Sequence, residues 1–285
     1  MGCFSSFKRR TDRFSQSFGP PGGSPQSKIF PASLHGSSFF SKTTFWFQTK
    51  FLPIIYPRRC PVCQKLLPCG QQICPGCRRI LPKITGPVCF SCGKPVSFPE
   101  QEFCYDCRLF KKSFKKGRAL FLYNEIIHPS IMDFKYHNHR LLSGFFTDEI
   151  VKSHGFELLT WNIQAVIPVP VHKNKRKKRG YNQAALLAKD LGFRLHLPCI
   201  SDLLLRTIDT PPQKAFSPQA RLKNIQNAFC LNPAYQSLLP TLHTVLLIDD
   251  IYTTGATMEA CTRVMRVQGI QNVYIYSLCI GIARD

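Results

Sequence analysis

The fold of this protein is decided by residues 245–257, which read VLLIDDIYTTGAT. Val245–Ile248 is a short apolar run, typical of a strand that is buried on both faces of a parallel sheet. Asp249 and Asp250 follow at the carboxyl end of this expected strand, which is the end where open α/β sheets bind their ligands. The stretch therefore predicts a ligand site between a buried strand and the helix that follows it.

The loop after the two aspartates suits a phosphate group. Its small residues let backbone N–H groups curl around a phosphate, its threonine hydroxyls add donors, and the next helix adds the positive end of its dipole. The predicted phosphate-binding residues are Thr253, Thr254, Gly255, Ala256 and Thr257.

Two adjacent carboxylates beside a phosphate loop repel each other unless they have something to contact. Ribose hydroxyls or a magnesium ion provide such a contact. We therefore expect Asp249 and Asp250 to be the catalytic carboxylates of the site, where they would hold the ribose. The alternative is that Asp249 caps a turn and Thr257 caps the helix, with no ligand involved.

Strands and helices alternate through the rest of the C-terminal part. We expect strands at 119–123, 165–169, 203–206, 244–248 and 273–280, and helices within 126–151, at 182–191 and at 257–267. A basic loop at 173–179 and a Pro-rich loop at 207–218 lie between them. This alternation predicts a parallel α/β sheet flanked by helices.

Several motifs resemble known families. Residues 248–257 resemble the phosphoribosyl pyrophosphate signature of the type I phosphoribosyltransferases. The wider chain is similar to the competence protein F (ComF) family, also called GntX-like, from about Leu52 to the C-terminus. The residues that carry this second resemblance are Pro168–Pro170, Lys178–Gln183, Arg221, Asn224 and Phe229.

The resemblance implies a type I phosphoribosyltransferase-like sheet that binds phosphoribosyl pyrophosphate, or another ribose 5-phosphate ligand, with Mg²⁺. It implies that the loop at Pro168–His172 grips the pyrophosphate and that Arg221 belongs to a mobile hood over the substrate, the alternative being a long surface loop. We expect Lys178 and Arg179 of the following basic run to point toward the pyrophosphate as well. The rest of the Lys173–Arg179 run is expected to point outward, the alternatives being a solvated loop or a nucleic-acid contact. Family membership further implies a role in natural competence and DNA uptake, with a phosphoribosyltransferase activity of the kind found in nucleoside metabolism.

The cysteines point to metal. Nine of the fourteen fall between Cys60 and Cys107, and eight of these nine form C-x-x-C pairs, which favours metal binding over disulfides. Two sets of four thiolates at this spacing predict two structural zinc ions, because neither set leaves a position open for water. The predicted ligands are Cys60, Cys63, Cys74 and Cys77 in one set, and Cys89, Cys92, Cys104 and Cys107 in the other.

Three alternatives for the cysteines stay open. The pairs could interleave in a cross-brace, and Cys69 could replace a ligand or stay free. An iron–sulfur cluster is the main rival to zinc, since four thiolates also hold one. Aromatic residues near the cysteines could stack on bases, but we expect them to form the module's small core.

The formal charge of +22 points to a polyanionic partner. The first 118 residues hold 20 of the 38 Lys and Arg but only 4 of the 16 acidic residues. Residues 1–44 are rich in Ser, Gly, Pro and Phe and are expected to be a disordered basic leader. We expect a double zinc-ribbon module with its basic connector at 45–118 and the phosphoribosyltransferase-like domain at 119–285.

Composition and motifs leave three functions open. The first is a phosphoribosyltransferase with an unknown acceptor. The second is a non-catalytic module that binds single-stranded DNA and keeps the phosphoribosyl fold as a sensor or relic. The third is a docking platform for a competence helicase or another part of the uptake machinery. No transmembrane segment or secretory signal is evident, so we expect a cytoplasmic protein.

Overall fold

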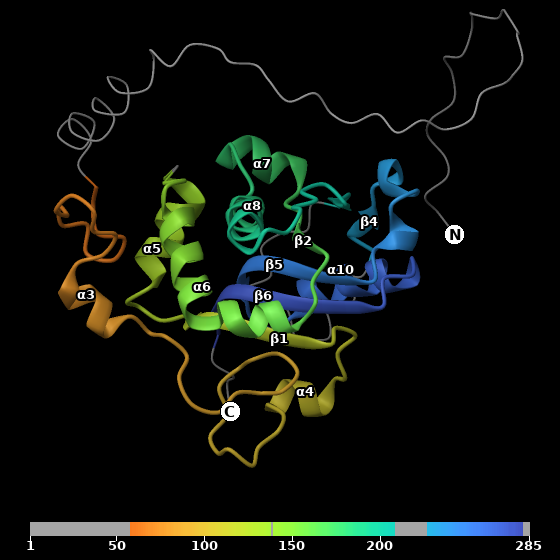
Figure 1. The fold of residues 1–285 in the computed structure, drawn as a ribbon, viewed down its shortest axis with the longest axis horizontal. Helices are drawn as coiled ribbons and strands as arrows, with labels where there is room; N and C mark the ends of the chain where they lie inside the picture. The colour runs from red at the N-terminus through yellow and green to blue at the C-terminus, as the bar shows by residue number, and fades with distance from the viewer. Residues whose placement is uncertain (1–57, 138, 209–226, 282–285) are drawn as a thin grey trace, which may run out of the picture. The chain divides into compact units, whose positions relative to one another are not determined.

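A computed structural model of the chain describes residues 58–137, 139–208 and 227–281. The leader expected at 1–44, the aromatic lead-in that follows it and most of the Pro-rich loop lie outside the described residues. Within the described part, a cysteine-rich segment precedes an α/β domain (Figure 1).

The α/β domain is built on a four-stranded sheet of order β1-β6-β5-β2, in which every neighbouring pair is parallel. Its strands are β1 (Lys116–Leu122), β2 (Ala165–Pro168), β5 (Thr244–Tyr252) and β6 (Asn272–Ile280). Successive side chains of a strand point to opposite faces of a sheet. In β5, Leu246 and Ile248 accordingly join one buried cluster and Val245 and Leu247 the other.

Helices cover both faces of this sheet (Figure 1). Buried side chains of α5 (His128–Tyr136), α6 (Leu142–Thr160) and α8 (Gln183–Leu195) form one cluster with the sheet, and those of α10 (Ala256–Val267) join the other. The helical region expected within 126–151 is thus two helices, the second of which runs on to Thr160. The expected phosphoribosyltransferase-like α/β fold is confirmed.

The strand expected near 203–206 does not belong to the main sheet. Its observed counterpart, β3 (Leu204–Arg206), pairs antiparallel with β4 (Phe229–Leu231), a strand that the sequence analysis did not predict. Thr207 N also donates to Ala228 O at 2.9 Å. The prediction that this strand belongs to the parallel sheet was therefore wrong. β3 instead pairs with β4, and the two strands bring together the two ends of the Pro-rich segment.

The basic loop expected at 173–179 is a helix, α7 (Lys173–Arg179). Lys and Arg are good helix formers, and their cations in the last turn suit the negative end of the helix dipole. The His172 side chain caps the start by accepting from Asn174 N, and Gly180 ends the helix with a left-handed φ of 79°. None of its residues is buried, so charge repulsion is relieved by water.

The cysteine-rich segment contains two short helices, α3 (Pro75–Ile80) and α4 (Tyr105–Leu109). Each begins directly after a cysteine of a C-x-x-C pair, Cys74 for α3 and Cys104 for α4. Two isolated bridges, Arg59 with Leu66 and Val88 with Pro95, close the turns that carry the other two pairs. The segment therefore repeats one small architecture twice, which we call the first ribbon (residues 58–82) and the second ribbon (residues 83–112).

A fully buried glutamate fastens the first ribbon and the first residue of the second ribbon to the domain. Glu149 of α6 forms ion pairs with Arg78 at 3.2 Å and with Lys83 at 2.7 Å. Burial raises the pKa of Glu149, but the two cations outweigh it and hold that pKa below its ordinary value. A buried carboxylate that lost these partners would be strongly destabilising, so the ribbon and α6 depend on each other.

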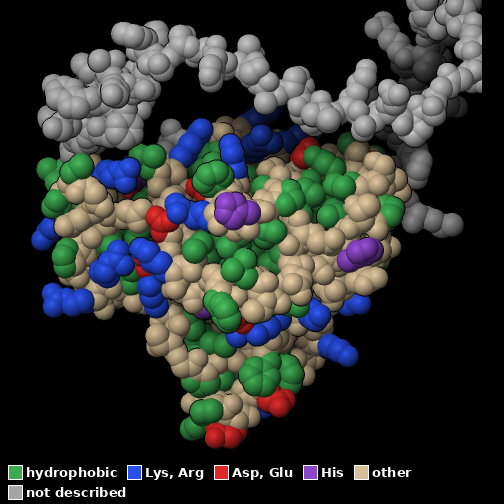
Figure 2. Space-filling model, in the orientation of Figure 1, with side chains coloured by type: hydrophobic (Ala, Val, Ile, Leu, Met, Phe, Trp, Pro, Cys, Tyr) green, Lys and Arg blue, Asp and Glu red, His purple; other side chains and the backbone are tan. Residues whose placement is uncertain are grey.

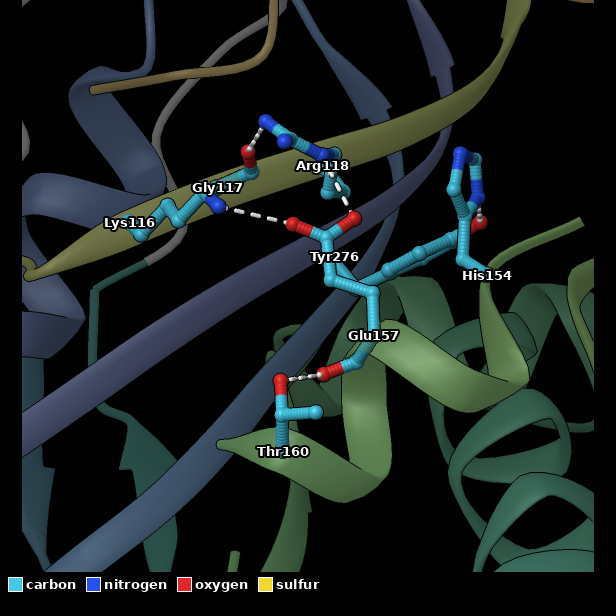
Figure 3. A network of polar contacts seen from close by, with 7 residues as sticks. All are labelled: Lys116, Gly117, Arg118, His154, Glu157, Thr160 and Tyr276. Atoms are coloured by element: carbon cyan, nitrogen blue, oxygen red, sulfur yellow. Dashed lines mark hydrogen bonds and ion pairs between the residues drawn. The ribbon is translucent and has the colours of Figure 1, made fainter. Parts of the chain in front are cut away.

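A second network anchors β1 near its start (Figure 3). Glu157 of α6 binds Lys116 at 2.7 Å and Arg118 at 2.8 Å, so one carboxylate joins the helix to two residues of the strand. One turn away, His154 Nδ1 lies 2.7 Å from the hydroxyl of Tyr276, which is buried on β6. In the sheet register Arg118 pairs with Tyr276, and Tyr276 pairs with Ile248, so this network crosses the middle of the sheet one residue before Asp249.

Among the described residues, no helix combines the length and the apolar character needed to cross a membrane.

Candidate functional site

The phosphate loop has the geometry that its sequence predicts. β5 ends at Tyr252, and α10 begins after Gly255, its N-cap, whose φ of 77° is left-handed. No side chain caps this helix, so Thr257 is not its cap and the alternative without a ligand loses that support. The first backbone N–H groups of a helix have no partner within the helix. Those of α10 are therefore donors for an anion.

Tyr252 lies directly beneath this loop. Its side chain is 2% exposed, and its hydroxyl has no hydrogen-bond partner among the described residues. A Cβ atom added to Gly255 would lie 2.1 Å from that hydroxyl oxygen, much closer than any real contact. Gly255 is thus required both by its backbone conformation and by the tyrosine packed against it.

The two aspartates lie side by side at the carboxyl end of β5. Both are half-buried, and Asp249 Oδ1 accepts the backbone N–H of Asp250 at 2.8 Å. Removal from water, together with the negative charge of Asp250, raises the pKa of Asp249 to about 7. A carboxylate in this condition is short of counter-charge, as expected for a group that contacts a cation or hydroxyls of a ligand.

This pKa predicts a pH-dependent stability. The folded carboxyl of Asp249 keeps its proton up to about pH 7, whereas its ordinary pKa is 3.8, so the free energy of unfolding falls as pH rises between these values. Asp249→Asn stays neutral and should gain stability over the wild type by on the order of 1 kcal/mol per pH unit from pH 5.5 to 7. Chemical denaturation at several pH values measures this difference, and a difference that does not change with pH would contradict the assignment.

A lysine that the sequence analysis missed pairs with the aspartates. Lys135 Nζ, near the end of α5, lies 3.0 Å from Asp250 Oδ2, and both side chains are mostly buried. Burial lowers the pKa of Lys135, but the charges of Asp250 and Asp249 outweigh it and raise that pKa. Nothing in the sequence around Lys135 marks it, because its neighbours show only a helical pattern.

The predicted pyrophosphate side is formed where α7 meets α8. Arg179 donates to Gln183 Oε1 at 3.2 Å and to the hydroxyl of Tyr136 at 3.1 Å, and its guanidinium lies over the Tyr136 ring. Arg179 is thereby joined to α5, which carries Lys135. Lys178 has an exposed side chain on α7, and Arg221 lies outside the described residues.

The eight cysteines predicted as ligands form two clusters, each of four sulfur atoms within 4.8 Å of one another. The clusters follow chain order and are not a cross-brace. Tetrahedral zinc with Zn–S bonds of about 2.3 Å places neighbouring sulfurs about 3.8 Å apart. Cys60 and Cys63 each lie 3.8 Å from Cys74, and Cys92 lies 3.6 Å from Cys104, so both clusters fit zinc.

Metal analysis of two cysteine variants tests this assignment. Cys92→Ser should hold one zinc ion per chain in place of two and should unfold more readily, because the ribbon has little core of its own. Cys69→Ser is the matched control, since Cys69 is exposed and belongs to neither cluster. Elemental analysis measures the bound metal; iron in the wild type, or two zinc ions in the Cys92 variant, would contradict the assignment.

Each ribbon packs against one wall of the candidate site. Cys60 of the first ribbon shares a buried cluster with Ile127 and Ile131, at the start of α5. Cys92 of the second ribbon shares the other cluster with Tyr252, the residue beneath the phosphate loop. Each cysteine cluster is therefore part of the same buried core as one wall of the site.

Aromatic residues of the second ribbon do not form its core, and that expectation was wrong. Hydrophobic side chains gather beside acidic ones in Figure 2, at the end where Figure 1 places α4. The ribbon is too small to cover these rings, and the zinc ligands take the interior positions in their place. The exposed rings are Phe90, Phe98, Phe103, Tyr105 and Phe110.

Comparisons with known proteins agree with this architecture. Residues 51–108 match the family described as "Double zinc ribbon domain". The chain is 28% identical over 229 residues to Competence protein F of Haemophilus influenzae, covering 77% of this chain and 96% of that protein. It is 26% identical over 210 residues to Competence protein ComFC of Bacillus subtilis, covering 72% and 82% of the two chains.

A similar match extends to a protein with a different name. The chain is 25% identical over 227 residues to DNA utilization protein YhgH of Shigella flexneri, covering 78% of this chain and 97% of that protein. These matches span the ribbons and the sheet together. With its N-terminal double zinc ribbon and its parallel sheet, the chain belongs to the competence protein F family.

Proposed function

We propose that the protein binds phosphoribosyl pyrophosphate with Mg²⁺ and transfers its phosphoribosyl group to a nitrogen nucleophile. One observation carries this proposal: the uncapped start of α10 and the carboxylates of Asp249 and Asp250 lie at the same end of β5. A phosphate and ribose hydroxyls are the two ligand groups that these features suit.

Different residues bind different parts of the ligand. The backbone N–H groups at the start of α10, with the hydroxyls of Thr253–Thr257, hold the 5-phosphate, and the two aspartates accept hydrogen bonds from the ribose hydroxyls. Lys178 and Arg179 contact the pyrophosphate, and Arg221 is proposed to close over it. Bound Mg²⁺ neutralises charge on the pyrophosphate.

Transfer then follows as a displacement at C1 of the ribose. The bond from C1 to the pyrophosphate oxygen breaks and its electron pair leaves with pyrophosphate, while the acceptor nitrogen forms a bond to C1 and loses a proton. The positive charges beside the pyrophosphate stabilise the leaving group as its charge develops. Exclusion of water matters because water competes with the nitrogen as a nucleophile.

Ligand competition tests the binding part of this proposal. Radiolabelled phosphoribosyl pyrophosphate should be retained by the zinc-loaded protein in Mg²⁺, displaced by pyrophosphate and by ribose 5-phosphate, and not displaced by ribose. Pyrophosphate release upon addition of candidate nitrogen nucleophiles then tests transfer. Retention without release for any acceptor would leave a binding protein that does not catalyse.

We propose further that the protein works in the uptake or processing of DNA. Three related proteins carry names that refer to competence or DNA utilization. The observation that favours direct contact with single-stranded DNA is the set of exposed rings on the second ribbon, which also carries the exposed cations Arg108 and Lys111 alongside the exposed acids Glu100 and Glu102. Exposed aromatic rings next to cations are the usual elements of single-strand binding.

Replacement of two exposed aromatic residues of the second ribbon by alanine tests this second proposal. Phe98→Ala combined with Phe103→Ala should weaken binding to an oligothymidine roughly tenfold or more, because each stacked base contributes about 1–3 kcal/mol. Phe193→Ala is the matched control, since this ring is 83% exposed but lies on α8. Fluorescence anisotropy at two salt concentrations gives both affinities. Equal binding by all three proteins would assign the rings to contact with another protein of the uptake machinery.

A further inference from the structure

Lys135 holds an unusual position in the candidate site. Its ammonium forms an ion pair with Asp250, one of the two carboxylates that the ribose hydroxyls or Mg²⁺ would need. The side chains of Lys135 and Asp250 are 13% and 14% exposed, so the pair lies at the inner wall of the site. A ligand that engages Asp250 must therefore compete with Lys135.

The backbone of Lys135 is fixed from two sides. Gln183 Nε2, at the start of α8, donates to Lys135 O at 3.1 Å. On the other side, Gln64 Nε2 of the first ribbon donates to Asp133 Oδ2 at 2.8 Å. The hydroxyl of Ser130 also donates to Pro61 O. The end of α5 is thus held in place. Lys135 can therefore change its partner only by rotation of its flexible four-carbon side chain.

A residue assigned to the pyrophosphate lies near Lys135. Arg179, assigned to the pyrophosphate, contacts Tyr136, the next residue after Lys135, and is close enough to affect the pKa of Lys135 through its charge. Gln183 links the two residues, because it accepts from Arg179 and donates to the backbone carbonyl of Lys135, so an anion bound by Arg179 would lie near Lys135. A lysine ammonium is a compact charge on a flexible stem, suited to exchange one oxygen partner for another.

We propose that Lys135 is a pyrophosphate-binding residue that is held by Asp250 in the absence of ligand. This proposal rests on the proposed binding of phosphoribosyl pyrophosphate. When the ligand enters with Mg²⁺, the ribose hydroxyls and the metal satisfy Asp250, and the ammonium of Lys135 turns to a pyrophosphate oxygen beside Arg179. The ion pair thereby keeps Asp250 neutralised until a complete ligand replaces its partner.

Titration of Lys135→Gln with three phosphate ligands and with Mn²⁺ tests the assignment. Affinity for pyrophosphate and for phosphoribosyl pyrophosphate should fall roughly tenfold to hundredfold, the range expected for a lost charge-assisted hydrogen bond. Affinity for ribose 5-phosphate should stay within about twofold, because its phosphate is held by α10. Binding of Mn²⁺ alone should tighten, since the competing cation is gone. Lys189→Gln, at an exposed position of α8, should match the wild type for every ligand.

A double-mutant cycle distinguishes a role of Lys135 in ligand binding from a role in stabilising the fold. In an Asp250→Asn background the ion pair is already lost, so adding Lys135→Gln breaks no further contact with residue 250. Pyrophosphate affinity should still fall roughly tenfold on that addition. An unchanged affinity in that background, or equal weakening of all three ligands by Lys135→Gln, would overturn the proposal and leave Lys135 a structural partner of Asp250. A wild-type protein that binds none of the three ligands would instead refute the proposed function, and this inference with it.

Discussion

Asp249→Asn combined with Asp250→Asn should abolish binding of phosphoribosyl pyrophosphate by the protein. The two carboxylates are the proposed partners of the ribose hydroxyls, and an amide offers one acceptor oxygen and no charge. Loss of two charge-assisted contacts is expected to cost at least about 3 kcal/mol, a weakening of more than a hundredfold. Calorimetric titration of both proteins in Mg²⁺ measures the change.

The double substitution also removes the partner of Lys135, so folding must be checked separately. Zinc content and the cooperativity of thermal unfolding should match those of the wild type. Asp190→Asn, which removes a carboxylate from α8, should bind the ligand normally and so controls for net charge. Retention of wild-type affinity by the double variant would remove the aspartates from the site.

Gly255→Ala should disrupt the phosphate loop as severely. Its φ of 77° costs an alanine about 1 kcal/mol, and the new methyl group would lie 2.1 Å from the Tyr252 hydroxyl oxygen. Because Tyr252 is buried and fills the space beneath the loop, either the loop or β5 must shift. We expect a loss of more than about 2 kcal/mol in unfolding free energy and at least a tenfold loss of ligand affinity.

Gly269→Ala distinguishes the cost of the left-handed backbone conformation from the cost of the contact with Tyr252. Gly269 also has a left-handed φ, of 99°, but no atom lies within 4 Å of the position a Cβ would take. This variant should therefore lose only about 1 kcal/mol of stability and bind the ligand as the wild type does. Equal effects of the two alanines on stability and ligand affinity would show that the contact with Tyr252 is unimportant.

The central part of the fold was predictable because its sequence signals are local. The apolar run of β5 predicts a buried strand, and Gly255 before a helical pattern predicts a turn at its end. The eight cysteines were equally predictable, since metal geometry depends on the C-x-x-C spacing. The domain limits at 44 and 118 and the roles of the site residues remain predictions.

The features that the sequence analysis missed depend on contacts distant along the chain. α7 was taken for a loop because its cations form no apolar face, although its caps, His172 and Gly180, are visible in the sequence. Lys135 was missed because only the packing of α5 on α8 and on the first ribbon brings it to Asp250. The aromatic rings of the second ribbon were expected to be buried because they are hydrophobic. That expectation ignored the small size of the ribbon, which has too few atoms to cover them.

Calorimetric titration of the zinc-loaded wild-type protein with phosphoribosyl pyrophosphate, with and without Mg²⁺, tests the central claim most directly. We predict one binding site per chain, with binding that is strengthened by Mg²⁺ and competed by ribose 5-phosphate. A protein that holds two zinc ions, unfolds cooperatively and yet binds no phosphoribosyl ligand would contradict the claim. The phosphoribosyltransferase-like domain would then be a scaffold for the ribbons, and the search for function would move to their exposed aromatic surface.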